Sequence, residues 1–553
     1  MNEMIARASA AQAKASDPAA SVFVSANAGT GKTKLLTDRV LRLLLSGAPA
    51  DGILCVTYTR AAAAEMRNRI FKRLANWATI PAKALGEDLE NMGIVTPSQD
   101  MRRRARSLFA EILDNDDGPR VETVHSFCQS ILRRFPIEAG VAPHVQLADD
   151  DEQSRLKAIA RANILYHPSP ELAASVLLIA EAVSEGRADE IVNDFINRAE
   201  GLESPDCLAR IESHFRDDLG VVSAAHERDV VMARLDLIQD EKLRSVSAAL
   251  QESGSKTQSD RGAKMDVWLA QTGEGKIARL SFLVDALFSA GKARKQLSNA
   301  DLRETVPQID AIQKQVIEII QPLLLGQAAQ ICRDRTMALY RFGMAFNQEY
   351  SRLKTQRGLL DYNDLIIRTN NLLAASEAAQ WVAWKLDNGI QHLLIDEAQD
   401  TSPAQWKLLR RLVDEFFDGE GASPYIASGA TSLPRTRVAV GDFKQSIYSF
   451  QGADPLVMNQ NRSELSSRAK AIQADFRDVP LSVSFRSASP ILDLVNKTIP
   501  DLGGIDDFTI HEMARSGAGG FVELWPVVKG NDDFGAEIIA ATQLARRVKS
   551  WIG

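Results

Sequence analysis

The feature that most constrains the fold is a succession of three segments near the N-terminus. The first, Ser21–Ser25 (SVFVS), has the apolar content of a buried strand. A short glycine-bearing turn, Ala26–Gly31, follows it. The third segment, Thr33–Leu45, repeats leucine and valine at the spacing of an amphipathic helix. Because a strand that leads through a tight turn into a helix is a building unit of α/β proteins, we expect a sheet covered by helices.

The turn has the residue types that hold phosphate groups. Consecutive backbone N–H groups would surround a phosphate at the N-terminus of the helix, and Lys32 would reach the β- and γ-phosphates of a nucleotide. The hydroxyl of Thr33 would ligate Mg²⁺. Ala26 stands where the pattern G-x-x-x-x-G-K-[ST] has its first glycine, so a fortuitous turn stays open as an alternative. The candidate phosphate-binding residues are Ala26, Asn27, Ala28, Gly29, Thr30, Gly31, Lys32 and Thr33.

A second candidate element lies far downstream, in the segment Gln391–Thr401 (QHLLIDEAQDT). Leu393–Ile395 is an apolar strand that places two carboxylates at its carboxyl end, where open α/β sheets bind their ligands. Asp396 would hold Mg²⁺ through water, and Glu397 would orient and deprotonate an attacking water. An acidic pair also suits an ordinary helix N-terminus. The strand context together with the phosphate turn favours a site for ATP and Mg²⁺.

Composition limits the class of protein. A chain of 553 residues is too long for one hydrophobic core, and 45% hydrophobic with 25% charged residues is typical of globular proteins. The four cysteines are far apart and form no C-x-x-C pair, which argues against a zinc site or a disulfide framework. We find neither a signal-peptide core nor an apolar run that could span a bilayer. We therefore expect a cytoplasmic protein without a membrane partner.

Charge alone does not indicate nucleic-acid binding, because the net charge is −7. Any polyanion must be held in local grooves. Basic clusters occur at Arg67–Arg73, Arg102–Arg106 and Arg133–Arg134. Each cluster, taken alone, is more typical of a solvated helix face than of a binding patch.

Seven segments of the sequence follow one another in a recognisable order. They are SANAGTGKT (25–33), ILCVTYTRAAAAEMRNR (53–69), VETVHSF (121–127), LDYNDLI (360–366), LLIDEAQDTSPAQW (393–406), VGDFKQSIYSFQGADP (440–455) and LSVSFRS (481–487). In this order the chain resembles the UvrD/Rep-type superfamily 1 DNA helicases, and within them the AddA-type helicase–nuclease proteins. The resemblance covers nearly the whole chain. It also implies that Ala26 is a tolerated variant of the phosphate turn.

The resemblance implies further residues around the nucleotide. Gln12 matches a glutamine that contacts the adenine edge, and Phe485 matches an aromatic ring that stacks on the base. Gln445 matches a glutamine that senses the γ-phosphate, and Arg486 an arginine that reaches the γ-phosphate from the second motor domain. Other roles stay open for three of them: a solvated side chain for Gln12, a structural hydrogen bond for Gln445 and a helix cap for Arg486.

The resemblance also implies a groove for single-stranded DNA. Hydroxyls and Arg60 suit contacts to phosphates, and aromatic rings suit stacking on unpaired bases. Phe127 is better explained as a core residue, and Phe450 has the same alternative. His125 could be an interior histidine, and no second ligand at a suitable spacing supports a metal there. Gln451 departs from the arginine frequent in this family. The candidate DNA-binding residues are Thr57, Tyr58, Arg60, Thr123, His125, Ser126, Tyr448 and Phe450.

The expected organisation is a RecA-like P-loop motor domain with a large inserted helical subdomain and the start of a second RecA-like domain. We expect residues 1–148 and 341–480 to form the first motor domain, 149–340 the insertion and 481–553 the beginning of the second. The polar stretch 252–264 is predicted to be a loop within the insertion, and 481–485 (LSVSF) a strand.

The expected activity is that of an ATP-dependent helicase that moves 3′–5′ on single-stranded DNA in double-strand break repair and recombination. Its expected partners are single-stranded DNA, duplex DNA ends and a nuclease subunit of the AddB type. The family's later motor motifs and the nuclease domain are not in this sequence, so the chain is expected to be an N-terminal portion. Two alternatives are a catalytically weak module that binds ATP and DNA, and a stand-alone UvrD-like repair helicase.

Overall fold

Two compact units make up the chain. One comprises residues 1–147 and 360–553, and the other is Ala148–Leu359. The four-part division expected from the sequence stays a prediction. A computed structural model describes residues 2–114, 118–197, 206–217, 224–298, 300–374, 382, 385, 389–417, 425–426, 432–447, 452–501, 509–514, 519–531 and 535–552.

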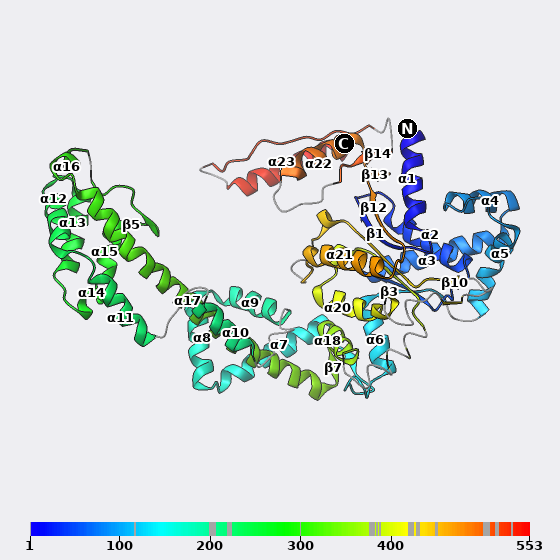
Figure 1. Cartoon of the computed structure of the whole chain (residues 1–553), viewed down its shortest axis with the longest axis horizontal. Helices are drawn as coiled ribbons and strands as arrows, with labels where there is room; N and C mark the ends of the chain where they lie inside the picture. Colours follow the sequence, from blue (N-terminus) through cyan, green and yellow to red (C-terminus); the bar gives the residue numbers. More distant parts are fainter. Residues whose placement is uncertain are drawn as a thin grey trace. The chain divides into compact units, whose positions relative to one another are not determined.

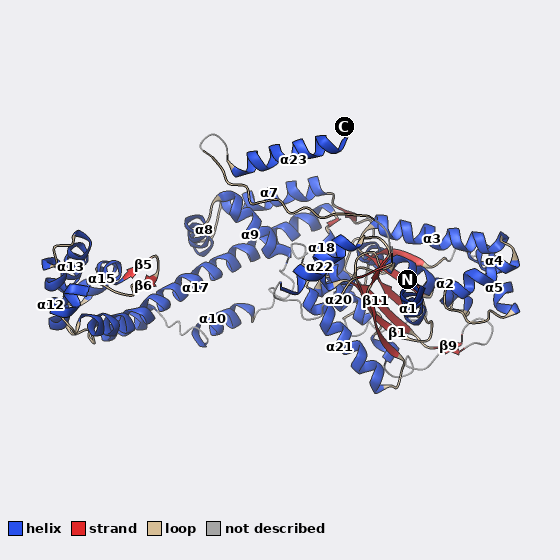
Figure 2. Cartoon of the chain, turned by 90° about the horizontal axis from the view of Figure 1, so that it is seen from above, coloured by secondary structure: helices blue, strands red, loops and turns tan. Residues whose placement is uncertain are grey.

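The first unit is built on a six-stranded parallel sheet with strand order β12-β1-β11-β8-β2-β3 (Figures 1 and 2). Since the strands are parallel, their carboxyl ends lie along one edge of the sheet. The loops that leave this edge are the places where an α/β protein binds its ligands. The strands are β1 (Ser21–Ala26), β2 (Ile53–Thr57), β3 (Arg120–Thr123), β8 (His392–Ile395), β11 (Thr436–Gly441) and β12 (Phe476–Leu481).

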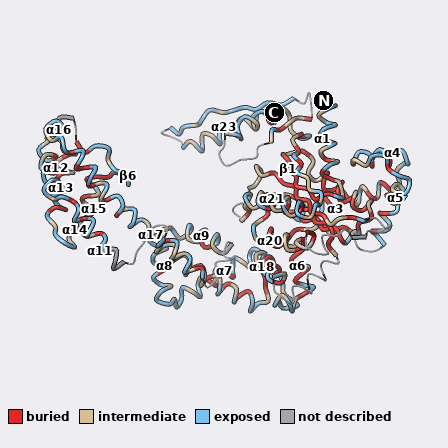
Figure 3. The backbone as a smooth tube through the Cα atoms, in the orientation of Figure 1, coloured by how far each residue is buried: buried red, intermediate tan, exposed pale blue. Residues whose placement is uncertain are grey.

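Both faces of this sheet are covered. Strands β2, β8 and β11 are buried at every residue, which explains their almost continuous apolar sequence. In β1, Val22 and Val24 pack into one core while Phe23 packs into the core on the opposite face. The register pairs Val24 with Val440. The expected α/β fold class is confirmed, with the sheet at the centre of the buried residues (Figure 3).

Helices α2, α3 and α5 contribute to one of the two cores, and α6, α18, α20 and α21 to the other. The helices of this unit are α1 (Asn2–Ala15), α2 (Lys32–Leu45), α3 (Arg60–Thr79), α4 (Ala82–Asn91), α5 (Gln99–Asp114), α6 (Val124–Arg134), α18 (Tyr362–Leu372), α20 (Pro403–Arg411), α21 (Pro455–Ala471), α22 (Ser489–Thr498) and α23 (Ala536–Ile552). Short strands are β4 (Gln146–Leu147), β7 (Leu359–Leu360), β9 (Tyr425–Ile426), β10 (Ser432–Leu433), β13 (Val483–Ser484) and β14 (Glu512–Met513).

The strand and the helix that flank the phosphate turn are confirmed as β1 and α2. The single strand predicted over 481–485 is wrong. The buried Leu481 ends β12, which adds to the main sheet beside β1, and the chain then starts the separate β13, paired with β14. The backbone of Ser482 separates the two pairings, a break that the alternating sequence LSVSF does not reveal.

Several arginines of the basic clusters are tied into the first unit. Arg67 donates to the backbone carbonyl of Val121 (2.6 Å), and Arg106 donates to that of Ile80 (2.8 Å), just beyond the end of α3. Arg73 forms ion pairs that are described below. The expectation of solvated helix faces is therefore wrong for these side chains.

The second unit is helical. No helix in the described parts of the chain is both long and apolar enough to cross a bilayer. The elements are α7 (Asp150–Tyr166), α8 (Pro170–Ala182), α9 (Glu185–Asn197), α10 (Cys207–Asp217), α11 (Ala224–Leu235), α12 (Asp240–Glu252), α13 (Lys256–Leu269), α14 (Glu274–Ala278), α15 (Leu280–Leu287), β5 (Phe288–Ser289), β6 (Lys292–Ala293), α16 (Ala300–Thr305) and α17 (Ile309–Arg357).

The loop predicted over 252–264 is wrong for most of its length. Only the short connection between α12 and α13 is a turn, and α13 begins at Lys256. Gly262 lies inside α13, where a Cβ atom would come within 2.6 Å of the carbonyl oxygen of Ser247 on α12. This glycine permits close packing of two helices, whereas the polar sequence around it suggested a break.

Candidate active site

The phosphate turn is a tight loop between β1 and α2. Gly29 and Gly31 have φ angles of 75° and 89°, a region that favours glycine. A Cβ atom at Gly29 would also lie 2.7 Å from the Cβ of Arg486. The hydroxyl of Thr30 donates to the carbonyl of Asn27 (2.8 Å) and closes the turn. The first turn of α2 contains no acidic residue. Its N-terminus is therefore suited to an anion.

The structure brings the phosphate turn and the acidic pair together. Lys32 Nζ donates to Glu397 Oε2 at 2.6 Å, although the two residues are far apart in the sequence. Glu397 adopts a left-handed backbone conformation (φ 49°) directly after β8. Asp396 beside it is buried, and burial, together with the charge of Glu397, raises its pKa to about 6. A desolvated carboxylate pair next to an ammonium group is electrostatically prepared for a bound cation and phosphates.

A hydrogen-bonded network joins this pair to the end of β11. Gln399 Nε2 donates to Glu397 Oε2 (2.9 Å), and Gln399 Oε1 accepts from the backbone N–H of Asp442 (2.9 Å). The carboxylate of Asp442 in turn accepts from Gln445 Nε2 (2.6 Å). The candidate γ-phosphate sensor Gln445 is thus linked to the glutamate through two intervening residues. Sequence analysis gave no role to Gln399 or Asp442, although both lie within the quoted motifs.

Asp400 is a further residue that sequence analysis missed. Burial and the neighbouring charge of Glu397 raise its pKa to about 6. Its Oδ2 accepts from Gln399 Nε2 (3.1 Å), while its buried Oδ1 has no hydrogen-bond partner among the described groups. An unpaired buried carboxylate oxygen costs free energy, which marks this end of the sheet as a site that is incomplete without a ligand.

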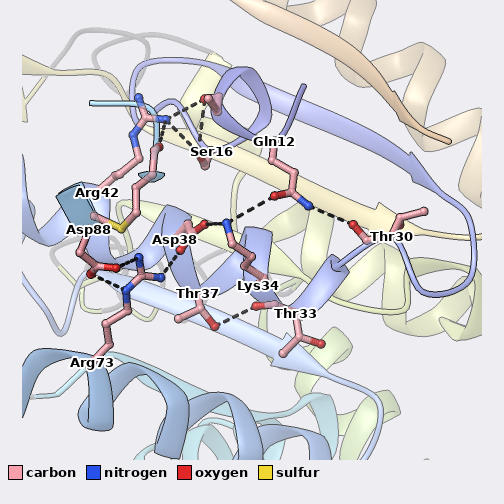
Figure 4. Close-up of polar contacts among 12 residues, drawn as sticks. Gln12, Ser16, Thr30, Thr33, Lys34, Thr37, Asp38, Arg42, Arg73 and Asp88 are labelled. Carbon is pink, nitrogen blue, oxygen red and sulfur yellow. Dashed lines mark hydrogen bonds and ion pairs between the residues drawn. The ribbon is translucent and has the colours of Figure 1, made fainter. Parts of the chain in front are cut away.

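On the other side of the turn lie the residues expected near the base. Gln12 on α1 is only 8% exposed, so the alternative of a solvated side chain is wrong. Its Nε2 donates to the carbonyl of Thr30 (3.0 Å), and its Oε1 accepts from Lys34 (3.3 Å) (Figure 4). Phe485 is 40% exposed, and its backbone N–H donates to the carbonyl of Gly29 (2.8 Å). Phe485 and Arg486 thus lie against the phosphate turn, and their roles toward a nucleotide remain predictions.

The described candidates for DNA contact follow the last two strands of the sheet. Thr57, Tyr58 and Arg60 follow β2 or end it, and the others lie at the end of β3. Thr57, Tyr58 and His125 line a small pocket whose lining includes Asp396. Because Asp396 belongs to the candidate ATP site, this pocket places the two sets of residues next to each other. Tyr448, Phe450 and Gln451 lie outside the described residues.

The polar groups after β3 are partly engaged in local structure. The hydroxyl of Thr123 caps α6 by accepting from the backbone N–H of Ser126 (3.2 Å), and the two hydroxyls are 3.0 Å apart. The ring of His125 meets Tyr362 edge-on, and burial together with the charge of Arg60 lowers its pKa. Phe127 is fully buried, which confirms it as a core residue.

Comparison with known proteins identifies the family. The family model of the UvrD/REP helicase N-terminal domain matches residues 7–466. The chain belongs to this family. The UvrD/REP match includes both the phosphate turn and the acidic pair, and it ends before Phe485 and Arg486.

Similar UvrD/REP-type proteins are named as subunits of an ATP-dependent helicase/nuclease. The protein of Limosilactobacillus fermentum is 27% identical over 86% of this chain and 35% of its own length. That of Latilactobacillus sakei is 24% identical over 86% of this chain and 52% of its own length. That of Enterococcus faecalis is 25% identical over 95% of this chain and 40% of its own length. The chain therefore spans between a third and about half of these relatives.

Proposed function

We propose that this chain carries the ATP-hydrolysing part of a DNA helicase that moves 3′–5′ and acts in double-strand break repair and recombination. One observation carries the proposal: Lys32 and Glu397 meet at 2.6 Å on the carboxyl edge of a parallel sheet. Membership of the UvrD/REP family gives this geometry its context. In this proposal Lys32 binds the β- and γ-phosphates of ATP, and Glu397 orients and deprotonates the attacking water.

The residues present fit a Mg²⁺ ion shared with phosphates. Asp396 supplies a buried carboxylate, and Thr33 a hydroxyl on the first turn of α2. Among the described residues, no group of three or more His, Cys, Asp or Glu side chains forms a metal site by itself. Mg²⁺ commonly binds through one or two protein ligands, water and nucleotide phosphates, and this donor set suits such binding. A bound ion would neutralise charge on the phosphates.

The ion pair of Lys32 and Glu397 would change when a triphosphate enters. Lys32 would move its hydrogen bond from the carboxylate to the phosphates, which leaves Glu397 free to accept the proton of a water. Gln399 keeps that carboxylate oriented through its own bond at 2.9 Å. Gln445, held by Asp442, would report the state of the γ-phosphate toward the DNA-binding loops.

The proposed DNA substrate is single-stranded DNA next to a duplex end. The polar and basic candidates Thr57, Arg60 and Ser126 suit contacts to phosphates, which fix the strand without reading its sequence. The names of the relatives describe part of a helicase/nuclease. We extend this to a nuclease-bearing partner of the AddB type, and to a place in the bacterial cytosol near the nucleoid.

The test is ATP hydrolysis by the purified chain with and without single-stranded DNA. We expect DNA to stimulate hydrolysis, and Lys32→Ala to reduce the stimulated rate by roughly a hundredfold or more because the phosphates lose their cation. Glu65→Gln, on the exposed face of α3, is the control and should keep the rate. DNA binding that is indifferent to ATP, with hydrolysis unaffected by Lys32→Ala, would instead indicate a binding module without catalysis.

A further inference from the structure

The side-chain amide of Gln12 has only one orientation that satisfies its neighbours. The carbonyl of Thr30 requires a donor, and this is Nε2 at 3.0 Å. The ammonium group of Lys34 requires an acceptor, and this is Oε1 at 3.3 Å. Reversing the amide would place its oxygen against a carbonyl and its NH₂ group against an ammonium. Both contacts appear in Figure 4.

This fixed orientation leaves one N–H and one oxygen lone pair of Gln12 for a ligand. Adenine offers a complementary edge, because N7 accepts and the N6 amino group donates. Guanine offers N7 and O6, which are both acceptors, so the oxygen of Gln12 would face another oxygen. An amide that could rotate freely would accommodate either base. The neighbours of Gln12 therefore decide how strongly it distinguishes the two.

The position of Lys34 depends on Asp38. Lys34 Nζ donates to Asp38 Oδ2 at 2.6 Å within α2. Helix energetics do not explain this pair, because a lysine in the first turn opposes the helix dipole and lysine before aspartate is the less favourable order. The pair instead keeps the ammonium group within reach of Gln12.

Asp38 is itself held by a second helix. Its side chain is only 3% exposed, and its Oδ1 accepts from Arg73 Nη1 of α3 at 2.6 Å. Arg73 also donates twice to Asp88, at 2.9 Å each, and Asp88 accepts from the indole N–H of Trp77 (2.6 Å). A planar guanidinium bound at two carboxylates has little freedom. The chain of contacts in Figure 4 therefore runs without interruption from α4 to Gln12.

The backbone that carries Gln12 is anchored independently. Arg42 of α2 donates to the carbonyl of Ala13 (2.7 Å) and to the hydroxyl of Ser16 (2.8 Å), both at the end of α1. A Cβ atom at Gly31 would come within 2.9 Å of Gln12 Nε2, so the amide lies directly on the phosphate turn. With α1 anchored in this way, Lys34 is left to fix the direction of the amide.

We propose that Asp38, held by Arg73, is a positioning residue that fixes the amide of Gln12 through Lys34 and thereby sets the preference for adenine over guanine nucleotides. The inference rests on the proposed function, since it requires a nucleoside triphosphate in the phosphate turn. It adds a specificity role for residues that do not touch the reacting phosphates.

The test is calorimetric binding of Mg·ATP, Mg·GTP and Mg·tripolyphosphate to the wild type, Asp38→Asn and Lys34→Met. We expect the ratio of the GTP to the ATP dissociation constant to fall roughly tenfold in both variants, within the range that one base-edge contact supplies. Binding of tripolyphosphate, which has no base, should stay within about twofold. Lys34 is half exposed, so its variant tests the inference even if Asp38→Asn does not fold.

A double-mutant cycle separates positioning from general damage. In a Gln12→Ala background, Asp38→Asn should leave the ATP-to-GTP ratio unchanged, because the residue through which it acts is gone. Glu65→Gln serves as the matched charge-removal control on α3. Equal weakening of all three ligands would overturn the inference and indicate a structural brace. If the wild type binds none of them, the proposed function fails instead.

Discussion

Asp396 carries its charge in a place that opposes it. It is buried, and burial with the nearby charge of Glu397 raises its pKa from 3.8 to about 6. A shift of this direction means that the folded chain binds more protons than the unfolded chain between about pH 4 and pH 6. The destabilisation is therefore absent below this window and complete above it. Such a residue is retained for function at the expense of stability.

We expect Asp396→Asn to raise the free energy of unfolding at pH 7.5 by roughly 1–3 kcal/mol, since the buried charge is removed. At pH 4, where the wild-type carboxyl group is largely protonated, the difference should vanish. Thermal unfolding at the two pH values measures both. ATP hydrolysis should be lost in the same variant. A variant equally stabilised at both pH values would show that the ionisation of Asp396 is not the cause, and Glu65→Gln should change neither.

At the residue scale the sequence predicted which side chains meet but not how they are held. The motifs contained Lys32 and Glu397, and their 2.6 Å contact follows from the parallel order of β1 and β8. The links through Lys34, Asp38 and Arg73 carry no sequence signal, because each is a common residue on a helix surface. Their distances depend on how helices α2 and α3 pack.

At the scale of elements, glycine inside a helix has two opposite meanings. Gly262 of α13 faces α12, where a Cβ would be 2.6 Å from a backbone oxygen, while Gly326 of α17 has no atom within 4 Å of its would-be Cβ. Sequence analysis treated the first as a sign of a loop. Composition reports the glycine but not the neighbouring helix, so the polar stretch around it was misassigned.

This pair of glycines gives a matched prediction. Gly262→Ala should destabilise the helical unit by about 1–3 kcal/mol, because backbone must move to admit the methyl group. Gly326→Ala should stabilise it by up to about 1 kcal/mol, because alanine is the better helix former and nothing obstructs it. Denaturant unfolding of both variants measures the difference. Two changes of the same sign would contradict the packing described here.

At the scale of the whole molecule, the order of the strands separates two tasks. The loops after β12, β1, β11 and β8 hold the nucleotide candidates, and those after β2 and β3 hold the described DNA candidates. Sequence analysis predicted the sheet and the motifs but not this order, which depends on pairings between distant segments. The pocket that contains both Tyr58 and Asp396 lies where the two groups of loops meet.

The net charge of −7 makes DNA binding dependent on these local loops, because the molecule as a whole repels a polyanion. If Arg60 contacts a phosphate, Arg60→Ala should weaken binding of single-stranded DNA similarly for all sequences and reduce the slope of log affinity against log salt by about 0.7. ATP affinity without DNA should not change, since Arg60 follows β2 on the other side of β8. Arg69→Ala, an exposed arginine on the same helix paired with Glu65, is the control. Equal slopes for the wild type and Arg60→Ala, measured by fluorescence anisotropy, would place the phosphate contact elsewhere.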